Sequence, residues 1–181
     1  MVGSGQPDGT SGPRAMTLAD NIVPYISGEE EKLESELTKI LGTVHVDHVA
    51  SAGMTVSAHC HRVATTEGHL EAVSIAFKAP VTPTSVEQAL LSFGESAALR
   101  LPSAPRPLIK LRSEVDRPQP RLDRDCGRGM AVVVGRVRKC SVLGVKFVLL
   151  SHNTVRGAAG GTLLNAELLA ERSQLPRRVS H

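Results

Sequence analysis

Aromatic residues are almost missing from this sequence. Its 181 residues include no tryptophan, one tyrosine and three phenylalanines, although 41% of them are hydrophobic. The interior must therefore be built from aliphatic side chains, and this hydrophobic fraction is enough to bury a single core. We expect no nucleic-acid partner, because proteins that bind unpaired bases stack them on aromatic rings.

Cysteine motifs and long apolar runs are also missing. The three cysteines, Cys60, Cys126 and Cys140, form no CxxC motif, and any disulfide would leave one of them unpaired. This pattern favours a reducing compartment. The N-terminal stretch MVGSGQPDGTSGPR lacks the apolar part of a secretion signal, and no segment approaches the ~20 apolar residues of a membrane span. We therefore expect a soluble, cytoplasmic protein without a membrane partner.

The chain is weakly basic, with a net charge of +3 and a sequence pI near 9.0. Its basic residues are spread along the sequence, which is typical of a solvated surface of mixed charge. A pocket for a small phosphate or carboxylate fits the composition equally well, because such a pocket needs only one or two cations.

Residues 1–17 are rich in glycine, serine and proline and predict a flexible segment. Three helices are predicted after it. A run of glutamates beginning at Glu29, followed by leucines and isoleucine at helical spacing, predicts a helix that ends at Gly42. A helix of about a dozen residues is predicted after Pro83, with its cap at Thr84 or Ser85. The last helix is expected after the final strand, where glycines interrupt it.

Alternating apolar and polar residues predict strands. One strand is expected from Met54 to Val63, and a second, around Val73 to Phe77, should pair with it as an antiparallel hairpin. Met130 to Val137 and Lys146 to Ser151 predict two more buried strands. The connection from Leu101 to Gly129 is too long for an ordinary loop. Hairpins with helices inserted between them predict an α+β fold, with a mainly antiparallel sheet covered by helices.

The predicted hairpin carries two candidate functional residues to one end. Alternation places Arg62 at the end of a covered face, where a guanidinium needs an anionic partner, and His69 opens the next strand. Together they would suit anion binding beside a general base. A structural role is left open, in which Arg62 pairs with Glu67 or Glu71.

Glycines and charged residues at two helix starts are further candidates. Glu29 and Lys32 lie one turn apart and could bind a ligand, or simply suit the helix dipole. Gly157, Gly160 and Gly161 open the last helix. They would allow either a ligand phosphate or a neighbouring segment to approach closely.

Histidine spacing gives only a weak metal signal. His45 and His48 are three residues apart, and His59 and His61 flank Cys60. A zinc site there is disfavoured, because Cys60 and its flanking histidines must point to opposite faces of one strand. We therefore predict no metal.

Four blocks of this sequence resemble aspartate-semialdehyde dehydrogenases of the fungal and archaeal type. In the family's order they are DNIVPYISGEEEKLESELTKILG at 20–42, VSAHCHRVATTEGHLEAVSIAF at 56–77, RPQPRLDRD at 117–125 and SHNTVRGAAGGTLLNAELL at 151–169. The resemblance implies a semialdehyde dehydrogenase dimerisation and substrate-binding domain over 18–155, similar to the C-terminal domain of glyceraldehyde-3-phosphate dehydrogenase. It also implies a helix at 156–172 that packs on an NADP-binding domain, followed by a basic tail at 173–181.

The resemblance also assigns roles to individual residues. In that family a cysteine forms a thiohemiacetal with the aldehyde, hydride passes to NADP, and phosphate releases aspartyl phosphate. By position, Arg62 would bind the substrate carboxylate and His69 would be the general base. Glu29 would hold the substrate amino group, for which Glu30 or Glu31 could substitute, and Lys32 would help to bind phosphate. Asn165 and the glycines at positions 157, 160 and 161 would lie near NADP, and the protein would be a homodimer.

Two family features do not occur in this chain. The glycine-rich dinucleotide fingerprint and the nucleophilic cysteine precede the point where this sequence begins, and none of the three cysteines takes the nucleophile's place. We therefore expect one part of an aspartate-semialdehyde dehydrogenase, inactive by itself, that serves lysine, threonine and methionine biosynthesis. A non-catalytic dimerisation or binding module and a related reductase, such as a malonyl-CoA reductase, are the alternatives.

Overall fold

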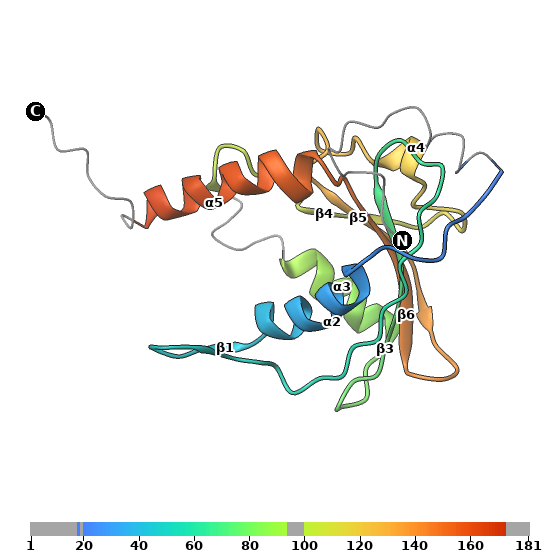
Figure 1. Ribbon diagram of the computed structural model, residues 1–181, viewed down its shortest axis with the longest axis horizontal. Coiled ribbons are helices and arrows are strands. Elements are labelled where there is room, and N and C mark those ends of the chain that lie inside the picture. The colour runs from blue at the N-terminus through green and yellow to red at the C-terminus, as the bar shows by residue number, and fades with distance from the viewer. Residues whose placement is uncertain (1–17, 19, 94–99, 173–181) are drawn as a thin grey trace, which may run out of the picture. The chain divides into compact units, whose positions relative to one another are not determined.

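The computed structural model describes residues 18, 20–93 and 100–172. It divides the chain into two compact units, Met1–Thr66 and Glu67–His181. The sequence patterns give no sign of this division. The helices and strands are drawn in Figure 1, and each unit is described by itself.

The first unit is built on helix α2, Glu29–Ile40. Gly28 is its N-cap, with φ of 73° in the left-handed region that glycine tolerates. Glutamates fill the first turn, where they oppose the positive end of the helix dipole. The predicted helix is confirmed, although its C-cap is Leu41, one residue before the expected Gly42. Strands β1 (Thr43–Val44) and β2 (Val49–Ala50) follow as a short antiparallel pair.

The segment from Met54 to Val63 is not a strand, so that prediction is wrong. It is extended, but its only strand-like contact among the described residues is one antiparallel bridge between Val23 and Arg62. Alternation still describes its exposure, since Cys60 is fully buried and its neighbour His59 is exposed. The sequence pattern therefore identified the covered face between Val56 and Cys60, whereas Met54, expected on the same face, is 45% exposed.

The second unit contains a four-stranded sheet in the order β3-β6-β5-β4. β3 (His69–Ile75) and β5 (Val132–Lys139) both run antiparallel to β6 (Val145–Ser151), which lies between them (Figure 1). β4 (Ile109–Arg112) pairs in parallel with β5. The mainly antiparallel α+β class is confirmed. The predicted hairpin is wrong, because β3 pairs with β6 along its whole length.

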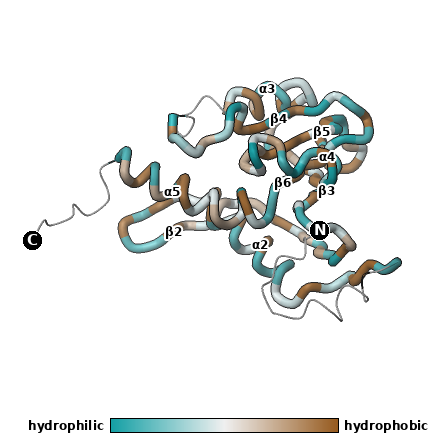
Figure 2. Tube along the Cα trace, turned by 90° about the horizontal axis from the view of Figure 1, so that it is seen from above, coloured by the Kyte–Doolittle hydropathy of each residue, from teal (hydrophilic) through white to brown (hydrophobic). Residues whose placement is uncertain are grey.

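The core of this second unit is aliphatic, as the shortage of aromatic residues requires. β5 and β6 supply its centre, where Val133, Val134, Val145 and Leu150 are at most 2% exposed. Figure 2 shows the valine run of β5 as a strongly apolar stretch of the chain. The two strands predicted here are confirmed, with boundaries that shift by only one or two residues.

Helices in the described part of the second unit accompany its sheet. Helix α3 (Pro83–Phe93) contacts β4 and β5. Thr82 and Ser85 exchange side-chain to backbone hydrogen bonds of 3.0 and 3.1 Å across its first turn, so the cap is Thr82 and not the expected Thr84 or Ser85. The short helix α4 (Pro120–Asp123) lies in the long connection.

The predicted last helix is confirmed as a π-helical turn, η2 (Val155–Ala159), continued by α5 (Gly160–Glu171). The switch from π to α geometry falls where the glycines interrupt the sequence pattern. Over the described ranges, no helix is long and apolar enough to cross a membrane.

Candidate functional site

The predicted site residues are divided between the two units. Glu29, Lys32 and Arg62 belong to the first unit, and His69, Gly157, Gly160, Gly161 and Asn165 belong to the second. The geometry below is given for each unit separately.

Arg62 is held through its backbone. Its N–H donates to the Val23 carbonyl at 2.9 Å, and the Val23 N–H donates to the Arg62 carbonyl at 3.1 Å. The Arg62 side chain is half-buried, and within the described residues of this unit no carboxylate forms an ion pair with its guanidinium. A planar, permanently charged group placed this way suits a carboxylate ligand.

Helix α2 offers three glutamates at its start, and the structure distinguishes them. The Glu30 carboxylate accepts a hydrogen bond from the Cys60 backbone N–H at 2.7 Å. Glu31 is exposed, and Glu29 is half-buried. Because Glu30 is already engaged and Glu31 faces solvent, Glu29 is the best placed of the three to bind a ligand amino group. Lys32, one turn along the helix, is exposed.

His69 begins strand β3 and lies opposite Ser151 of β6. The residue before it, Gly68, has φ of 109°, and a Cβ there would lie 3.2 Å from Leu150 Cδ1. The Gly68 N–H donates to the Asn153 side-chain oxygen at 2.9 Å. Gly68 and Asn153 therefore fix the turn that leads into His69. Sequence reasoning missed Asn153, although a polar residue two positions after a buried strand was an available signal.

Three residues close in the sequence to this turn each have a buried polar atom without a hydrogen-bond partner in the described part of the chain. Glu67 Oε2, Asn153 Nδ2 and Arg156 Nη1 are buried and have no hydrogen-bond partner among the described residues. Buried polar groups in proteins are nearly always hydrogen-bonded. One acceptor and two donors near the ends of β3 and β6 therefore have hydrogen-bonding capacity that the described residues do not use.

The glycines of the last helix serve mainly its own packing. A Cβ at Gly160 would collide with Met130 Sδ, and a Cβ at Gly161 would lie 2.6 Å from the Arg156 carbonyl oxygen. Of these four candidates for nucleotide binding, Gly157 and Asn165 are the two that are exposed.

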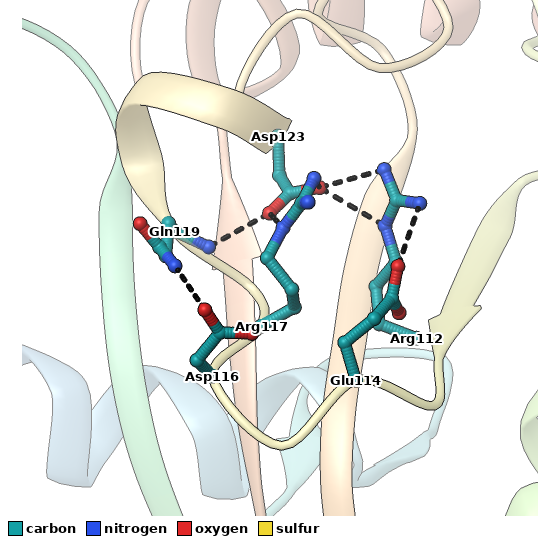
Figure 3. Close-up of polar contacts among 6 residues, drawn as sticks. All are labelled: Arg112, Glu114, Asp116, Arg117, Gln119 and Asp123. Atoms are coloured by element: carbon teal, nitrogen blue, oxygen red, sulfur yellow. Dashed lines mark hydrogen bonds and ion pairs between the residues drawn. The ribbon is translucent and has the colours of Figure 1, made fainter.

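Asp123 forms a buried ion cluster that the sequence analysis did not predict (Figure 3). The residue is 1% exposed, and its carboxylate accepts hydrogen bonds from Arg117 Nε at 2.6 Å, Arg112 Nε at 3.0 Å and the Gln119 backbone N–H at 2.7 Å. Burial by itself would raise the pKa of Asp123, but these donors outweigh it and lower the pKa to about 2. Both carboxylate oxygens are occupied, so the cluster fastens the long connection to the sheet.

The histidines considered for zinc do not assemble a metal site in the described part of the chain, where no group of three or more suitable ligands occurs. His45 and His48 stack at 4.7 Å between ring centroids, and His48 Nδ1 lies 2.7 Å from an Asp47 carboxylate oxygen. His59 and His61 are tilted, with ring centroids 6.5 Å apart.

Comparison with known proteins settles the family. Residues 4–156 match the family described as semialdehyde dehydrogenase, dimerisation domain. This chain belongs to that family.

Individual relatives agree with this assignment. The chain is 47% identical to aspartate-semialdehyde dehydrogenase of Archaeoglobus fulgidus over 169 residues, which are 93% of this chain and 47% of the relative. It is 49% identical to the enzyme of Aspergillus fumigatus over 177 residues, 93% of this chain and 48% of the relative. The chain thus spans about half the length of the curated relatives that it matches.

Solved structures give the same result for the fold. Aspartate-semialdehyde dehydrogenase of Candida albicans, solved with NADP, matches with a TM-score of 0.80 and 44% identity over 89% of this chain and 47% of that chain. Aspartate-semialdehyde dehydrogenase II of Vibrio cholerae, complexed with ASA, matches with a TM-score of 0.65 and 28% identity over 85% of this chain and 42% of that chain. The resemblance found in the sequence blocks and the expected fold class are both confirmed.

Proposed function

We propose that this chain is the substrate-binding and dimerisation part of an aspartate-semialdehyde dehydrogenase. The complete enzyme would interconvert aspartyl phosphate and aspartate semialdehyde with NADP, in the biosynthesis of lysine, threonine and methionine. The observation that carries the proposal is the identity of 47% and 49% to two such enzymes over 93% of the chain.

The first unit supplies the groups that bind substrate. Arg62 forms a charge-assisted, bidentate contact with the substrate carboxylate, because its planar guanidinium matches that group. Glu29 accepts from the substrate ammonium group. Lys32 provides a compact cation for phosphate. The half-buried positions of Arg62 and Glu29 and the exposure of Lys32 are compatible with these roles.

The second unit supplies the proton-transfer group. A histidine can accept and return a proton near neutral pH, which is what activation of a thiol nucleophile requires. His69 is that general base in our proposal, and the turn fixed by Gly68 and Asn153 supports its position. Cys60 is fully buried, which argues against a nucleophilic role for it. The proposal assigns the nucleophilic cysteine to the half of the relatives that this chain does not match.

NADP, when bound, accepts or donates the hydride. The accessible Gly157 and Asn165 would touch its edge, and the proposal assigns the main nucleotide site to the unmatched half of the relatives. The family's name supports a homodimer as the assembly of the complete enzyme.

Exchange of the matching half in a relative tests this function. We would replace the equivalent region of the Archaeoglobus fulgidus enzyme with this chain, confirm folding by circular dichroism and assembly by light scattering, and measure NADP reduction with aspartate semialdehyde and phosphate. We expect turnover by the chimera and none by the 181-residue chain alone.

A folded, dimeric chimera without turnover would contradict the proposal and favour a non-catalytic binding module. Oxidation of NADPH with malonyl-CoA as the substrate would favour the other reductase. Turnover by the 181-residue chain alone would show that one of its own cysteines is the nucleophile.

A further inference from the structure

The extended segment that carries Arg62 is attached to helix α2 by two carboxylates. Glu30 Oε1 accepts from the Cys60 N–H at 2.7 Å, and Glu34 Oε1 accepts from the Ala58 N–H at 2.8 Å. Cys60 is fully buried and Ala58 is half-buried, so these two bonds are partly shielded from water. We call this pair of glutamates the carboxylate clasp.

The spacing of the clasp matches the spacing of the backbone that it holds. Two residues four positions apart on a helix are separated by about 6 Å along its axis. In an extended chain, alternate N–H groups on one edge are about 6.5 Å apart. Glu30 and Glu34 can therefore take the place of two carbonyl groups on a neighbouring strand. This is why the segment stays extended without a β-ladder.

The same edge of the segment continues to Arg62. In extended backbone the N–H groups of alternate residues point to one side. Those of Ala58 and Cys60 bind the clasp, and that of Arg62 binds the Val23 carbonyl at 2.9 Å. Three consecutive contacts on one edge thus fix the register in which Arg62 is presented.

We propose that Glu30 and Glu34 are positioning residues for Arg62, holding the backbone before it so that its guanidinium meets the substrate carboxylate. This inference rests on the proposed function, because it takes Arg62 to be the carboxylate-binding residue. It also gives Glu30 a role different from that of Glu29, which binds substrate directly. Neither clasp residue touches the substrate.

The test uses the isotope-labelled 181-residue chain and four sets of substitutions. Glu30→Ala combined with Glu34→Ala removes both acceptors. Glu30→Gln combined with Glu34→Gln keeps one acceptor oxygen on each side chain but removes the charge. Glu36→Ala is the matched control, an exposed glutamate on the same helix. Arg62→Ala removes the group that is positioned. Nuclear magnetic resonance would report amide exchange at positions 58 and 60, the Arg62 Nε–H signal, and the Kd for aspartate semialdehyde.

In the double alanine variant we expect amide exchange at positions 58 and 60 to quicken by about tenfold or more, since a charge-assisted hydrogen bond protects each. The Arg62 Nε–H signal should shift, and Kd should rise by about tenfold. The double glutamine variant should recover most of the affinity and protection, and Glu36→Ala should match the parent. Arg62→Ala should abolish binding while the two amides stay protected.

Several outcomes would overturn the inference. Unchanged amide exchange would show that the clasp does not form in solution. Lost protection with unchanged Kd and an unchanged Arg62 signal would show that the clasp is only structural. If the double alanine variant unfolds, the glutamine variant decides: a Kd as weak as that of Arg62→Ala would contradict positioning by these oxygens.

A parent chain that does not bind aspartate semialdehyde would contradict the proposed function instead. The Arg62 signal would then decide on the clasp by itself. If that signal were the same in the parent and in the double variants, positioning of Arg62 by the clasp would be wrong.

Discussion

The two units of this chain are stabilised by different means. In the second unit, a four-stranded sheet pairs backbone with backbone and covers an aliphatic core that includes Val133, Val145 and Leu150. In the described part of the first unit, the buried apolar residues are Ile26 and Cys60, and helix α2 buries none of its residues fully. There the carboxylate clasp and one strand bridge supply contacts that a sheet supplies in the second unit.

Because of this difference, the two units should be sensitive to different kinds of substitution. A packed core responds to lost volume, because surrounding atoms do not fill the cavity completely. A segment held by side-chain carboxylates responds to lost acceptors, because each N–H then loses its partner. Arg62 and Glu29, the groups proposed to bind substrate, lie in the first unit, where carboxylates hold the backbone. His69, the proposed base, lies at the end of a strand in the packed sheet of the second unit.

The largest effect is expected from truncation in the core. Leu150 is 1% exposed, and Leu150→Ala should lower the free energy of unfolding by about 2–5 kcal/mol. Leu37, which is 41% exposed on α2, is the matched control, and Leu37→Ala should cost less than about 1 kcal/mol. Urea denaturation followed by circular dichroism would measure both. Equal costs would remove the contrast between the units.

An intermediate effect is expected from acid. Folding lowers the pKa of Asp123 from 3.8 to about 2, so protonation favours the unfolded chain. The stabilisation is complete above about pH 4 and is lost as the pH falls toward 2. It amounts to about 2 kcal/mol. Urea midpoints measured between pH 5 and pH 2 should show this loss.

Asp123→Asn should be less stable at neutral pH and should lack that part of the acid dependence. Asp125→Asn is the control, because the Asp125 side chain is 80% exposed. If the parent and Asp123→Asn lost stability equally between pH 4 and pH 2, the ion cluster would not contribute as described.

The smallest effect is expected at the turn before His69. Asn153→Ala removes the acceptor of the Gly68 N–H and should cost about 1 kcal/mol. Hydrogen exchange at positions 68 and 69 should quicken, whereas Asn165→Ala, at an exposed position of α5, should leave it unchanged. Unaltered exchange in Asn153→Ala would mean that this side chain does not hold the turn.

Local patterns were sufficient to predict the helices and the central strands. Helix α2 follows from its glutamates and apolar spacing, and β5 and β6 follow from their valine-rich runs. The segment from Met54 to Val63 has an equally good strand pattern, but its partners are glutamates of α2. Alternation reports which face is covered, and it cannot report whether a strand or a helix side chain completes the backbone hydrogen bonds.

Long-range charge pairing was equally inaccessible from sequence. Arg112, Arg117 and Asp123 lie in a connection whose charges resemble those of a solvated loop, and only folding brings them together. The candidate site shows the same limit. Arg62 and His69 stand out as residue types, but their proposed roles came from resemblance to a family. The backbone contacts that hold their segments became visible only in the structure.

The central claim is that this chain binds and positions the substrate of an aspartate-semialdehyde dehydrogenase. Steady-state kinetics of the chimeric enzyme carrying Arg62→Ala or His69→Asn tests it most directly. Arg62→Ala should raise KM and lower kcat/KM. The lost transition-state stabilisation should be about 2–4 kcal/mol, as expected for loss of a bidentate charged contact. His69→Asn should lower kcat by about 10²–10⁴-fold with little change in KM, the usual effect of losing a general base. Parent-like kinetics in both variants would contradict the account.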